Sequence, residues 1–187
     1  MTQHVCPWWL GYTFITPLRR LFQDPLKILA PYVHEGMTVL EPGPGMGFFT
    51  LDMARLVGSS GQVFAIDLQP EMLKVLRRRA VKAGLQGRVQ SRLAQSDSLD
   101  IADLNRTVDF VLAFAMVHEV PAAHSFFGEM FDALKPGGTL LLAEPRGHVG
   151  AAAFQAELDT GAQVGFQVEP GPSIRRSYSA LLEKREA

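Results

Sequence analysis

Short apolar runs alternate with segments of helical periodicity through most of the chain, and this alternation restricts the fold more than any other feature. Predicted strands lie at 38–40, 63–66, 89–94, 110–114 and 139–143, and most of them are short apolar runs. Helical patterns lie at 48–57, 70–83, 126–134 and 151–160. Strands that alternate with helices form a parallel sheet, because each helix carries the chain back to the start of the next strand.

The last segment breaks this alternation. Strand patterns at 166–168 and 178–182 follow each other without a helix, and the connector Glu-Pro-Gly-Pro at 169–172 consists mainly of turn residues. Two strands joined in this way pair as antiparallel neighbours. We therefore predict an α/β fold, a Rossmann-like three-layer sandwich. Its mostly parallel seven-stranded sheet ends in an antiparallel C-terminal hairpin, with helices on both faces.

The N-terminal segment differs from the rest because it holds both tryptophans of the chain, Trp8 and Trp9. Asp24-Pro25 predicts a helix N-cap followed by proline at the first helical position. A length of 187 residues fits one domain. We expect 1–35 to form an aromatic cap and helix of the same domain as 36–187.

Composition limits the classes of partner. Eighteen Lys and Arg against nineteen Asp and Glu give a formal net charge of -1, which provides no general attraction to nucleic acid or anionic membrane. Cys6, the only cysteine, excludes an internal disulfide and fits a reducing cytoplasm. The longest apolar run, 110–117, is too short to span a bilayer, and the N-terminus lacks a signal-peptide pattern. We expect a cytoplasmic protein without a membrane span.

The segment Glu-Pro-Gly-Pro-Gly-Met-Gly at 41–47 joins the first strand to the helix at 48–57. Alternating glycines let backbone approach a ligand closely at such a turn. A dinucleotide fingerprint places its third glycine one residue later. Glu41 also puts a negative charge just before the turn. The segment therefore favours a ligand that carries a nucleoside and positive charge over one that carries a pyrophosphate.

Two further acids follow strands. Asp67 directly follows 63–66, where an acid can bond ribose hydroxyls. Asp97 follows the third strand and can accept from an exocyclic amine such as that of adenine. Ligands of open parallel sheets bind at the carboxyl ends of the strands. The alternatives are that Asp67 caps a helix and that Asp97 caps a loop.

Taken together, these segments resemble the class I S-adenosylmethionine-dependent methyltransferases, particularly the small-molecule type that includes the quinone-biosynthesis enzymes. The resemblance covers roughly 36–184, and its carrying segments are 41–47, 67–72, Asp97, 134–140 and 166–182. It implies an enzyme that moves a methyl group from S-adenosylmethionine to a small-molecule acceptor by in-line displacement and releases S-adenosylhomocysteine.

The resemblance also implies the donor-binding residues. Glu41 would meet the amino group, Asp67 the ribose hydroxyls and Asp97 the adenine amine. Phe114 would border the sulfonium. The full implied set is Glu41, Gly43, Gly45, Gly47, Phe48, Asp67, Leu68, Met72, Asp97, Ser98 and Phe114. Leu68 and Met72 would enclose the adenine, although a core position for Met72 is compatible with that role.

His118 is the candidate catalytic residue, since it lies shortly after the strand 110–114. Imidazole titrates near neutrality and can take a proton from an oxygen, nitrogen or carbon acid. The alternative is that His118 orients substrate or fills a loop hydrogen bond. Arg146 could hold a substrate carboxylate or pair with Glu144.

The acceptor side has further open alternatives. Trp9 and Tyr12 could line the acceptor pocket, or pack on the domain or in a homodimer interface. Residues 114–117 lack the Asn/Asp-Pro-Pro-aromatic signature of methyltransferases that act on base amines, so we expect no DNA substrate. No carboxylate cluster predicts a catalytic metal. The rival functions are an NAD-dependent oxidoreductase and a non-catalytic S-adenosylmethionine-binding protein.

Overall fold

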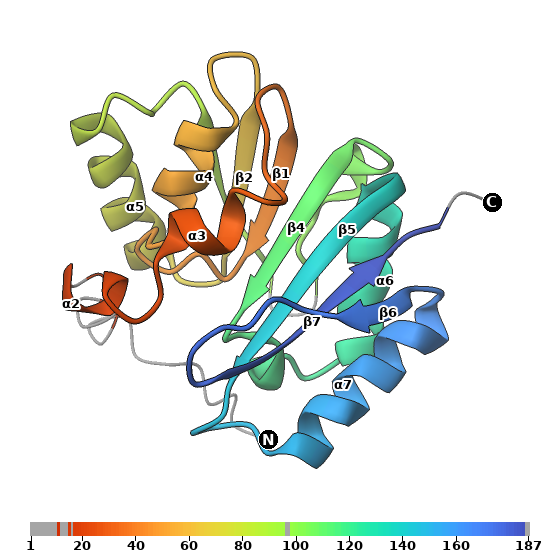
Figure 1. Cartoon of the computed structure of the whole chain (residues 1–187). Helices are drawn as coiled ribbons and strands as arrows, with labels where there is room; N and C mark the ends of the chain where they lie inside the picture. Colours follow the sequence, from red (N-terminus) through yellow and green to blue (C-terminus); the bar gives the residue numbers. More distant parts are fainter. Residues whose placement is uncertain (1–10, 12–14, 16, 96–97, 186–187) are drawn as a thin grey trace. The chain divides into compact units, whose positions relative to one another are not determined.

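The structure is a computed structural model that describes residues 11, 15, 17–95 and 98–185 (Figure 1). Trp9, Tyr12 and Asp97 lie outside the described residues, so the roles predicted for them stay predictions. The chain divides into two compact units, one of Val5–Ser96 and one built on Asp97–Ala187. The predicted division of one domain into an aromatic cap and helix at 1–35 and the remainder at 36–187 rests on the aromatic composition of the first segment and stays a prediction.

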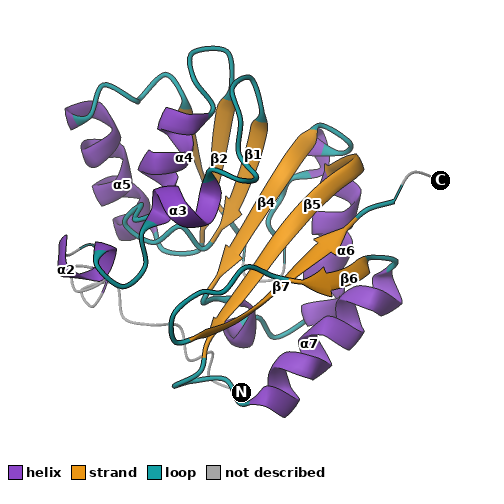
Figure 2. Ribbon diagram, viewed as in Figure 1, coloured by secondary structure: helices purple, strands orange, loops and turns teal. Residues whose placement is uncertain are grey.

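Seven strands form the sheet, in the order β3-β2-β1-β4-β5-β7-β6 (Figure 2). Their bounds are β1 Thr38–Pro42, β2 Gln62–Asp67, β3 Val89–Leu93, β4 Val108–Phe114, β5 Leu134–Pro145, β6 Gln167–Pro170 and β7 Ser177–Glu183. Strand β2 is parallel to β1 and β3, and β4 is parallel to β5. Strand β7 is antiparallel to both β5 and β6. The predicted mostly parallel seven-stranded sheet with an antiparallel closing hairpin is confirmed.

The unit Val5–Ser96 includes the helices α2 Pro17–Arg20, α3 Pro25–Leu29, α4 Thr50–Leu56 and α5 Pro70–Lys82. The predicted cap of α3 is confirmed, because the Asp24 side chain accepts from the Leu26 amide at 3.1 Å. Helices α4 and α5 pack against β2 and β3, and α3 lies against α4 (Figure 1). Each of these helices buries apolar residues, among them Leu29 of α3, Met53 of α4 and Leu76 of α5.

The register of β1 and β2 places the glycine-rich turn beside the end of β2. Glu41 pairs with Ala65 and Pro42 with Ile66. The Gly43 amide then donates to the Ile66 carbonyl at 2.8 Å, so the chain leaves β1 next to the start of the β2–α5 connection. The turn continues to Phe49, so α4 begins at Thr50 and not at the predicted residue 48.

The described part of the second unit includes the 3-10 helices η2 Ala102–Leu104 and η3 Val117–Glu119 and the α-helices α6 Ala123–Ala133 and α7 Ala151–Val164. Helix α6 packs on β5, and α7 packs on β6 and β7 (Figure 2).

Strand β5 begins earlier than predicted, because the expected turn at 135–138 is a bulge within the strand. Val108 pairs with Leu134, whereas Phe110 already pairs with Thr139. The extra residues are held from the other side by β7 and the residue after it. The Gly137 amide donates to the Lys184 carbonyl at 2.6 Å, and the Lys184 amide donates to the Gly138 carbonyl at 2.9 Å. These bonds satisfy backbone that the bulge removes from the β4 ladder.

Candidate donor and base sites

Glu41 is a buried acid at the start of the glycine-rich turn. Its residue is 3% exposed, and the Thr50 hydroxyl donates to its Oε2 at 2.5 Å. Burial is the main cause that raises the pKa of Glu41 to about 8. The Thr50 hydrogen bond opposes this change. The negative charge of Asp67 raises the pKa further, and the positive charge of Arg19 lowers it. A buried carboxyl with this pKa gains strongly from a cation placed beside it.

Two glycines of the turn have different surroundings: position 47 requires glycine, whereas position 45 borders open space. Gly47 has φ +80°, and a Cβ there would lie 2.3 Å from Leu76 Cδ1. Gly45 also has a positive φ, of +54°, but no heavy atom lies within 4 Å of the position its Cβ would take. Backbone at Gly45 therefore borders open space that a ligand can enter without displacing a side chain.

Asp67, at the end of β2, is bound to backbone on two sides. Its Oδ2 accepts from the Gly45 amide at 3.1 Å and its Oδ1 from the Gln69 amide at 2.9 Å. The capping alternative is thus present in the structure. Each carboxylate oxygen can accept a second hydrogen bond, so contact with ribose hydroxyls remains chemically compatible and stays a prediction.

The two residues predicted to enclose the adenine differ in accessibility. Leu68 is 39% exposed, which is unusual for a leucine next to a buried strand end, whereas Met72 is 6% exposed. A Cβ at the buried Gly11 would lie 2.9 Å from both Sδ and Cε of Met72. Met72 therefore lies in the core, and the predicted contact of Leu68 with the adenine stays a prediction that its exposure permits.

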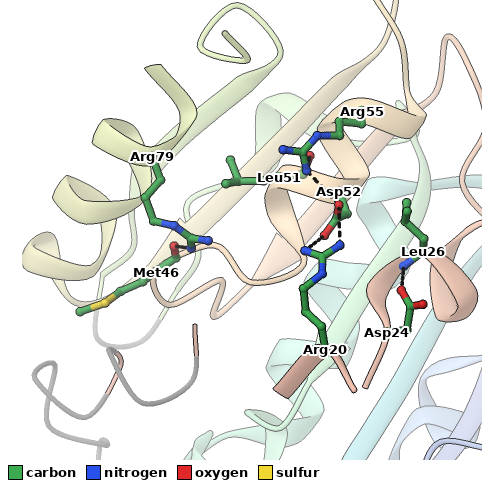
Figure 3. Close-up of polar contacts among 8 residues, drawn as sticks. All are labelled: Arg20, Asp24, Leu26, Met46, Leu51, Asp52, Arg55 and Arg79. Atoms are coloured by element: carbon green, nitrogen blue, oxygen red, sulfur yellow. Dashed lines mark hydrogen bonds and ion pairs between the residues drawn. The ribbon is translucent and has the colours of Figure 1, made fainter. Parts of the chain in front are cut away.

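Arginines hold the glycine-rich turn and α4 from outside (Figure 3). Arg79 on α5 donates to the Met46 carbonyl within the turn. On α4, the Asp52 carboxylate accepts from Arg20 Nη1 at 2.9 Å and Nη2 at 3.3 Å, and from Arg55 Nη1 at 2.8 Å. Because Asp52 is 2% exposed and Arg20 belongs to α2, this pair fixes α2 to α4.

Arg19, which the sequence does not single out, lies against the two phenylalanines that follow the glycine-rich turn. Its guanidinium carbon lies 4.2 Å from the centroid of the Phe48 ring and 5.6 Å from that of Phe49. Burial lowers the pKa of Arg19 to about 10, and the charge of Glu41 opposes this change. The only signal in the sequence is the Arg-Arg pair before the Asp24 cap, which is equally typical of a solvated surface.

In the second unit, His118 on η3 forms a dyad with Glu144 near the end of β5. His118 Nδ1 lies 2.6 Å from Glu144 Oε2, and Glu144 is fully buried. Glu144 Oε1 accepts from the Val117 amide at 2.8 Å and from the His118 amide at 3.3 Å. The hydrogen bond to Glu144 is the main cause that raises the pKa of His118 above its ordinary value of 6.5, against the effect of burial.

Other titratable groups surround this dyad. The His148 ring stacks on His118 with centroids 6.2 Å apart, and Glu119 Oε1 lies 4.0 Å from His118 Nε2. Burial and, next, the charge of Glu144 raise the pKa of Glu157 on α7 to about 7. From the sequence, Glu144 is predicted only as a possible partner of Arg146, and neither His148 nor Glu157 is singled out as a site residue. Strand and helix patterns do not reveal that Glu144 and His148 meet His118 or that the charge of Glu157 acts on it.

The remaining predicted residues of this unit have local contacts. Arg146 Nε donates to the Ser177 carbonyl at 3.1 Å, and its guanidinium lies 4.8 Å from the Tyr178 ring centroid. The Ser98 hydroxyl accepts from the Asp100 amide at 3.0 Å. Phe114 is half-buried as the last residue of β4. Glu144 is bound to His118, so the alternative of an Arg146–Glu144 pair receives no support, and the substrate role of Arg146 stays a prediction.

The family description "Methyltransferase domain" matches residues 33–169 of this chain. The chain therefore belongs to the methyltransferase-domain family. The resemblance to class I S-adenosylmethionine-dependent methyltransferases is confirmed, and with it the prediction of an enzyme whose cofactor is S-adenosylmethionine.

Individual relatives agree with this family. The chain is 34% identical over 112 residues to the ubiquinone/menaquinone biosynthesis C-methyltransferase UbiE of Klebsiella pneumoniae, and 37% identical over the same length to UbiE of Azotobacter vinelandii. Each match covers 60% of this chain and 44% of the relative, so the chain spans less than half the length of these proteins.

A solved structure covers more of the chain. The S-adenosylmethionine-dependent methyltransferase of Aquifex aeolicus has a TM-score of 0.83 and 25% identity, over 96% of this chain and 98% of its own. A second neighbour, from Methanococcus maripaludis, shares the fold with a TM-score of 0.77 at 13% identity. Among the described residues, no helix combines the length and apolar character needed to cross a bilayer.

Proposed function

We propose that this protein transfers a methyl group from S-adenosylmethionine to a small molecule with an ionisable hydroxyl group, and that His118 takes the proton of that hydroxyl. The observation that carries this proposal is the His118–Glu144 dyad, in which a fully buried carboxylate holds one imidazole nitrogen at 2.6 Å. A dyad of this kind activates an acceptor that is weakly nucleophilic while it keeps its proton.

The turn after β1 fits the methyl donor. The open space at Gly45 admits a ligand against the backbone, and the buried Glu41 carboxyl suits the donor's ammonium group. Asp67 is the candidate for the ribose hydroxyls, and Leu68 offers an exposed apolar surface to the adenine. S-adenosylmethionine would supply a methyl carbon activated by a sulfonium sulfur. The residues of the chain then have to bind the donor and the acceptor, align them and deprotonate the acceptor.

The dyad defines which imidazole nitrogen can act. Glu144 accepts hydrogen bonds from two backbone amides, so its carboxylate is held as an acceptor and His118 Nδ1 must carry a proton toward it. In neutral His118 the lone pair that can take a proton is therefore on Nε2. When Nε2 accepts the acceptor's proton, Glu144 stabilises the resulting imidazolium. Glu144 thus acts as a positioning residue and His118 as the base.

The chemistry named for the relatives is compatible with this reaction. The matched UbiE proteins are named as C-methyltransferases of ubiquinone and menaquinone biosynthesis. Loss of a proton from a hydroxylated ring raises electron density at the oxygen and at the adjacent ring carbons, so the same base serves methylation at either position. We extend the acceptor class to hydroxylated, quinone-related small molecules. We place the reaction in the cytoplasm, because a single cysteine fits a reducing compartment. We expect no DNA acceptor, because the chain is nearly neutral and lacks the base-amine signature.

The test is transfer of labelled methyl groups from S-adenosylmethionine into a panel of hydroxylated aromatic and quinone-related compounds. Because only neutral His118 can accept a proton, the rate should rise with pH through the raised pKa of His118 and then level off. The variant His118→Gln should lower kcat by about 10²–10⁴-fold, the usual range for a lost general base. The affinity of the same variant for S-adenosylhomocysteine should stay unchanged.

The variant Glu144→Gln separates a base from a structural histidine. Loss of the carboxylate returns the pKa of His118 toward 6.5, so the acidic limb of the pH–rate profile should move to lower pH while kcat falls. An unchanged rate and profile in His118→Gln contradicts the proposal. A protein that binds the donor but labels no compound supports the non-catalytic alternative, and stabilisation by NAD alone supports the oxidoreductase.

A further inference from the structure

Helix α7 carries a carboxyl group, that of Glu157, which the proposed reaction leaves without a role. Its Oε2 is buried, and no donor in the described part of the chain forms a hydrogen bond with it. We propose that Glu157 is a positioning residue of the base site and that its carboxylate, together with that of Glu144, stabilises protonated His118. This inference rests on the proposed function and names a further residue for it. The residues involved all belong to the unit built on Asp97–Ala187.

One side of α7 lies over the end of β5, where Glu144 is found. Phe154, Glu157 and Gly161 are three and four residues apart, so they lie along one side of the helix, and Phe154 and Gly161 are buried. The Phe154 ring stacks on that of Tyr178, with centroids 5.4 Å apart. Tyr178 pairs with Glu144 in the register of β5 and β7, and paired residues point to the same face of a sheet. The side of α7 that carries Glu157 therefore covers the face that carries Glu144.

Glu157 and His118 act electrostatically on each other. Burial and, next, the charge of Glu144 raise the pKa of Glu157 to about 7, whereas the charge of His118 lowers it. On His118, the hydrogen bond to Glu144 is the main cause of the raised pKa, and the charge of Glu157 adds to it. A carboxyl with a pKa of about 7 changes its charge near neutrality, in the range where an imidazole also titrates. The two groups therefore exchange protons with solvent over overlapping ranges of pH.

Other ionisable groups lie near this pair. Glu119 on η3 has its Oε1 4.0 Å from His118 Nε2, and its charge also raises the pKa of His118. The His148 ring, between β5 and α7, stacks on His118 with centroids 6.2 Å apart. Arg146 donates to a backbone carbonyl of β7 and lies over a tyrosine ring of the same strand. Of these groups, His148 is the one whose own titration resembles that expected for Glu157, so it requires a control.

The proposed reaction creates a positive charge at this cluster. As the acceptor's O–H bond breaks, its electron pair stays on the oxygen and a new N–H bond forms at His118 Nε2. Glu144 holds the opposite nitrogen, Nδ1, at 2.6 Å, and Glu157 adds a second negative charge from α7. Two carboxylates thus stabilise the imidazolium. The same attraction spreads the titration of His118 over a wider range of pH, because a proton taken up by Glu157 removes a charge that favours the protonated imidazole.

Nuclear magnetic resonance can follow this titration through the ring Cε1–H signals of the five histidines, from about pH 5 to 9. The His118 signal is the one that is missing from His118→Gln. In the wild type its titration should have an apparent Hill coefficient below about 0.8. In Glu157→Gln the coefficient should rise to about 1, and the midpoint should move to lower pH, since the uncharged amide cannot favour the imidazolium.

Kinetics and a matched control complete the experiment. In labelled methyl transfer, Glu157→Gln should lower kcat at high pH by about 2–10-fold, and its Kd for S-adenosylhomocysteine should stay unchanged. Asp159→Asn removes a carboxylate from the exposed side of α7, where Asp159 accepts from Gln155, and should leave the titration of His118 unchanged. Circular dichroism and the Tm of each variant check that it is folded. The Hill coefficient of the wild type tests the coupling without any substitution.

The outcomes distinguish this inference from the proposed function. A wild-type coefficient of about 1, or a titration of the same midpoint and width in Glu157→Gln, overturns the inference. Broadening that persists in Glu157→Gln and disappears in His148→Gln assigns the coupling to His148 and overturns it as well. Each of these results leaves methyl transfer by the dyad standing. Methyl transfer that is unaffected in His118→Gln contradicts the proposed function, and the coupling of Glu157 to His118 then has no role in catalysis.

Discussion

Replacing Glu41 with glutamine should change how the stability of the protein depends on pH. The folded-state pKa of Glu41 is about 8, whereas its ordinary value is 4.5. Between these values the folded protein holds a proton that the unfolded chain releases. The free energy of unfolding of the wild type should therefore decrease as pH rises from 4.5 to 8, because the unfolded state binds fewer protons. Glutamine cannot titrate, so the variant loses this contribution.

The size of the effect follows from the pKa difference. Each pKa difference of one corresponds to about 1.4 kcal/mol, so the full change between pH 4.5 and 8 is about 5 kcal/mol. Between pH 5.5 and 7.5 the stability of Glu41→Gln relative to the wild type should rise by about 3 kcal/mol. The buried amide also has an unmet hydrogen-bond requirement that costs about 1–3 kcal/mol. That cost is the same at every pH, so the slope alone measures the titration.

Urea unfolding of both proteins at pH 5.5, 6.5 and 7.5 gives this slope. The exposed Glu71 on α5 provides a matched control, since Glu71→Gln removes the same charge from a solvated position. Other titrating groups cancel because they are common to wild type and variant. If the stability difference between Glu41→Gln and the wild type is constant to within about 0.5 kcal/mol across this range, the pKa assigned to Glu41 is wrong. The assignment of burial as the cause of the raised pKa is then wrong as well.

Two other changes test the turn. Gly47→Ala combines a left-handed backbone with a Cβ 2.3 Å from Leu76, so it should destabilise the protein by about 2–4 kcal/mol in urea unfolding. Gly45→Ala has open space around its Cβ and should cost only about 1–2 kcal/mol. Equal losses in the two variants would contradict this reasoning. Asp67→Asn weakens the bonds from the Gly45 and Gln69 amides and should raise Kd for S-adenosylhomocysteine about tenfold by calorimetry. An unchanged Kd would restrict Asp67 to capping.

The sequence predicts most of the fold because its signals are local. Strand and helix periodicities and the Asp24 cap each act over a few positions, and the structure confirms them. The predicted connector at 169–172 is placed too early, because β6 continues to Pro170. The bulge in β5 escapes such reasoning because it depends on hydrogen bonds to Lys184, some fifty residues further along the chain. A Lys-Pro-Gly-Gly sequence read alone predicts a turn.

The candidate sites divide in the same way. The glycine-rich turn, Glu41 and Asp67 follow from residue types at strand ends, which a single sequence reveals. Arg19 and Glu144 do not, because each matters through a partner far away in the chain. Glu144 is 26 residues from His118, and nothing in its own strand distinguishes it from any other acid at a strand end. Only the folded chain shows that Glu144 lies beside His118 and that Arg19 lies beside Phe48.

The Asp67 carboxylate joins the turn at Gly45 to the start of α5 at Gln69, and this gives the donor site an energetic consequence. A nucleoside bound at Asp67 and an amino acid bound along the turn would each act on the same carboxylate. Their binding free energies should therefore be non-additive. The intact donor should bind more strongly than the summed binding free energies of adenosine and methionine, measured as separate fragments, predict. The site would thereby discriminate the whole cofactor from the abundant free amino acid and nucleoside that resemble its two halves.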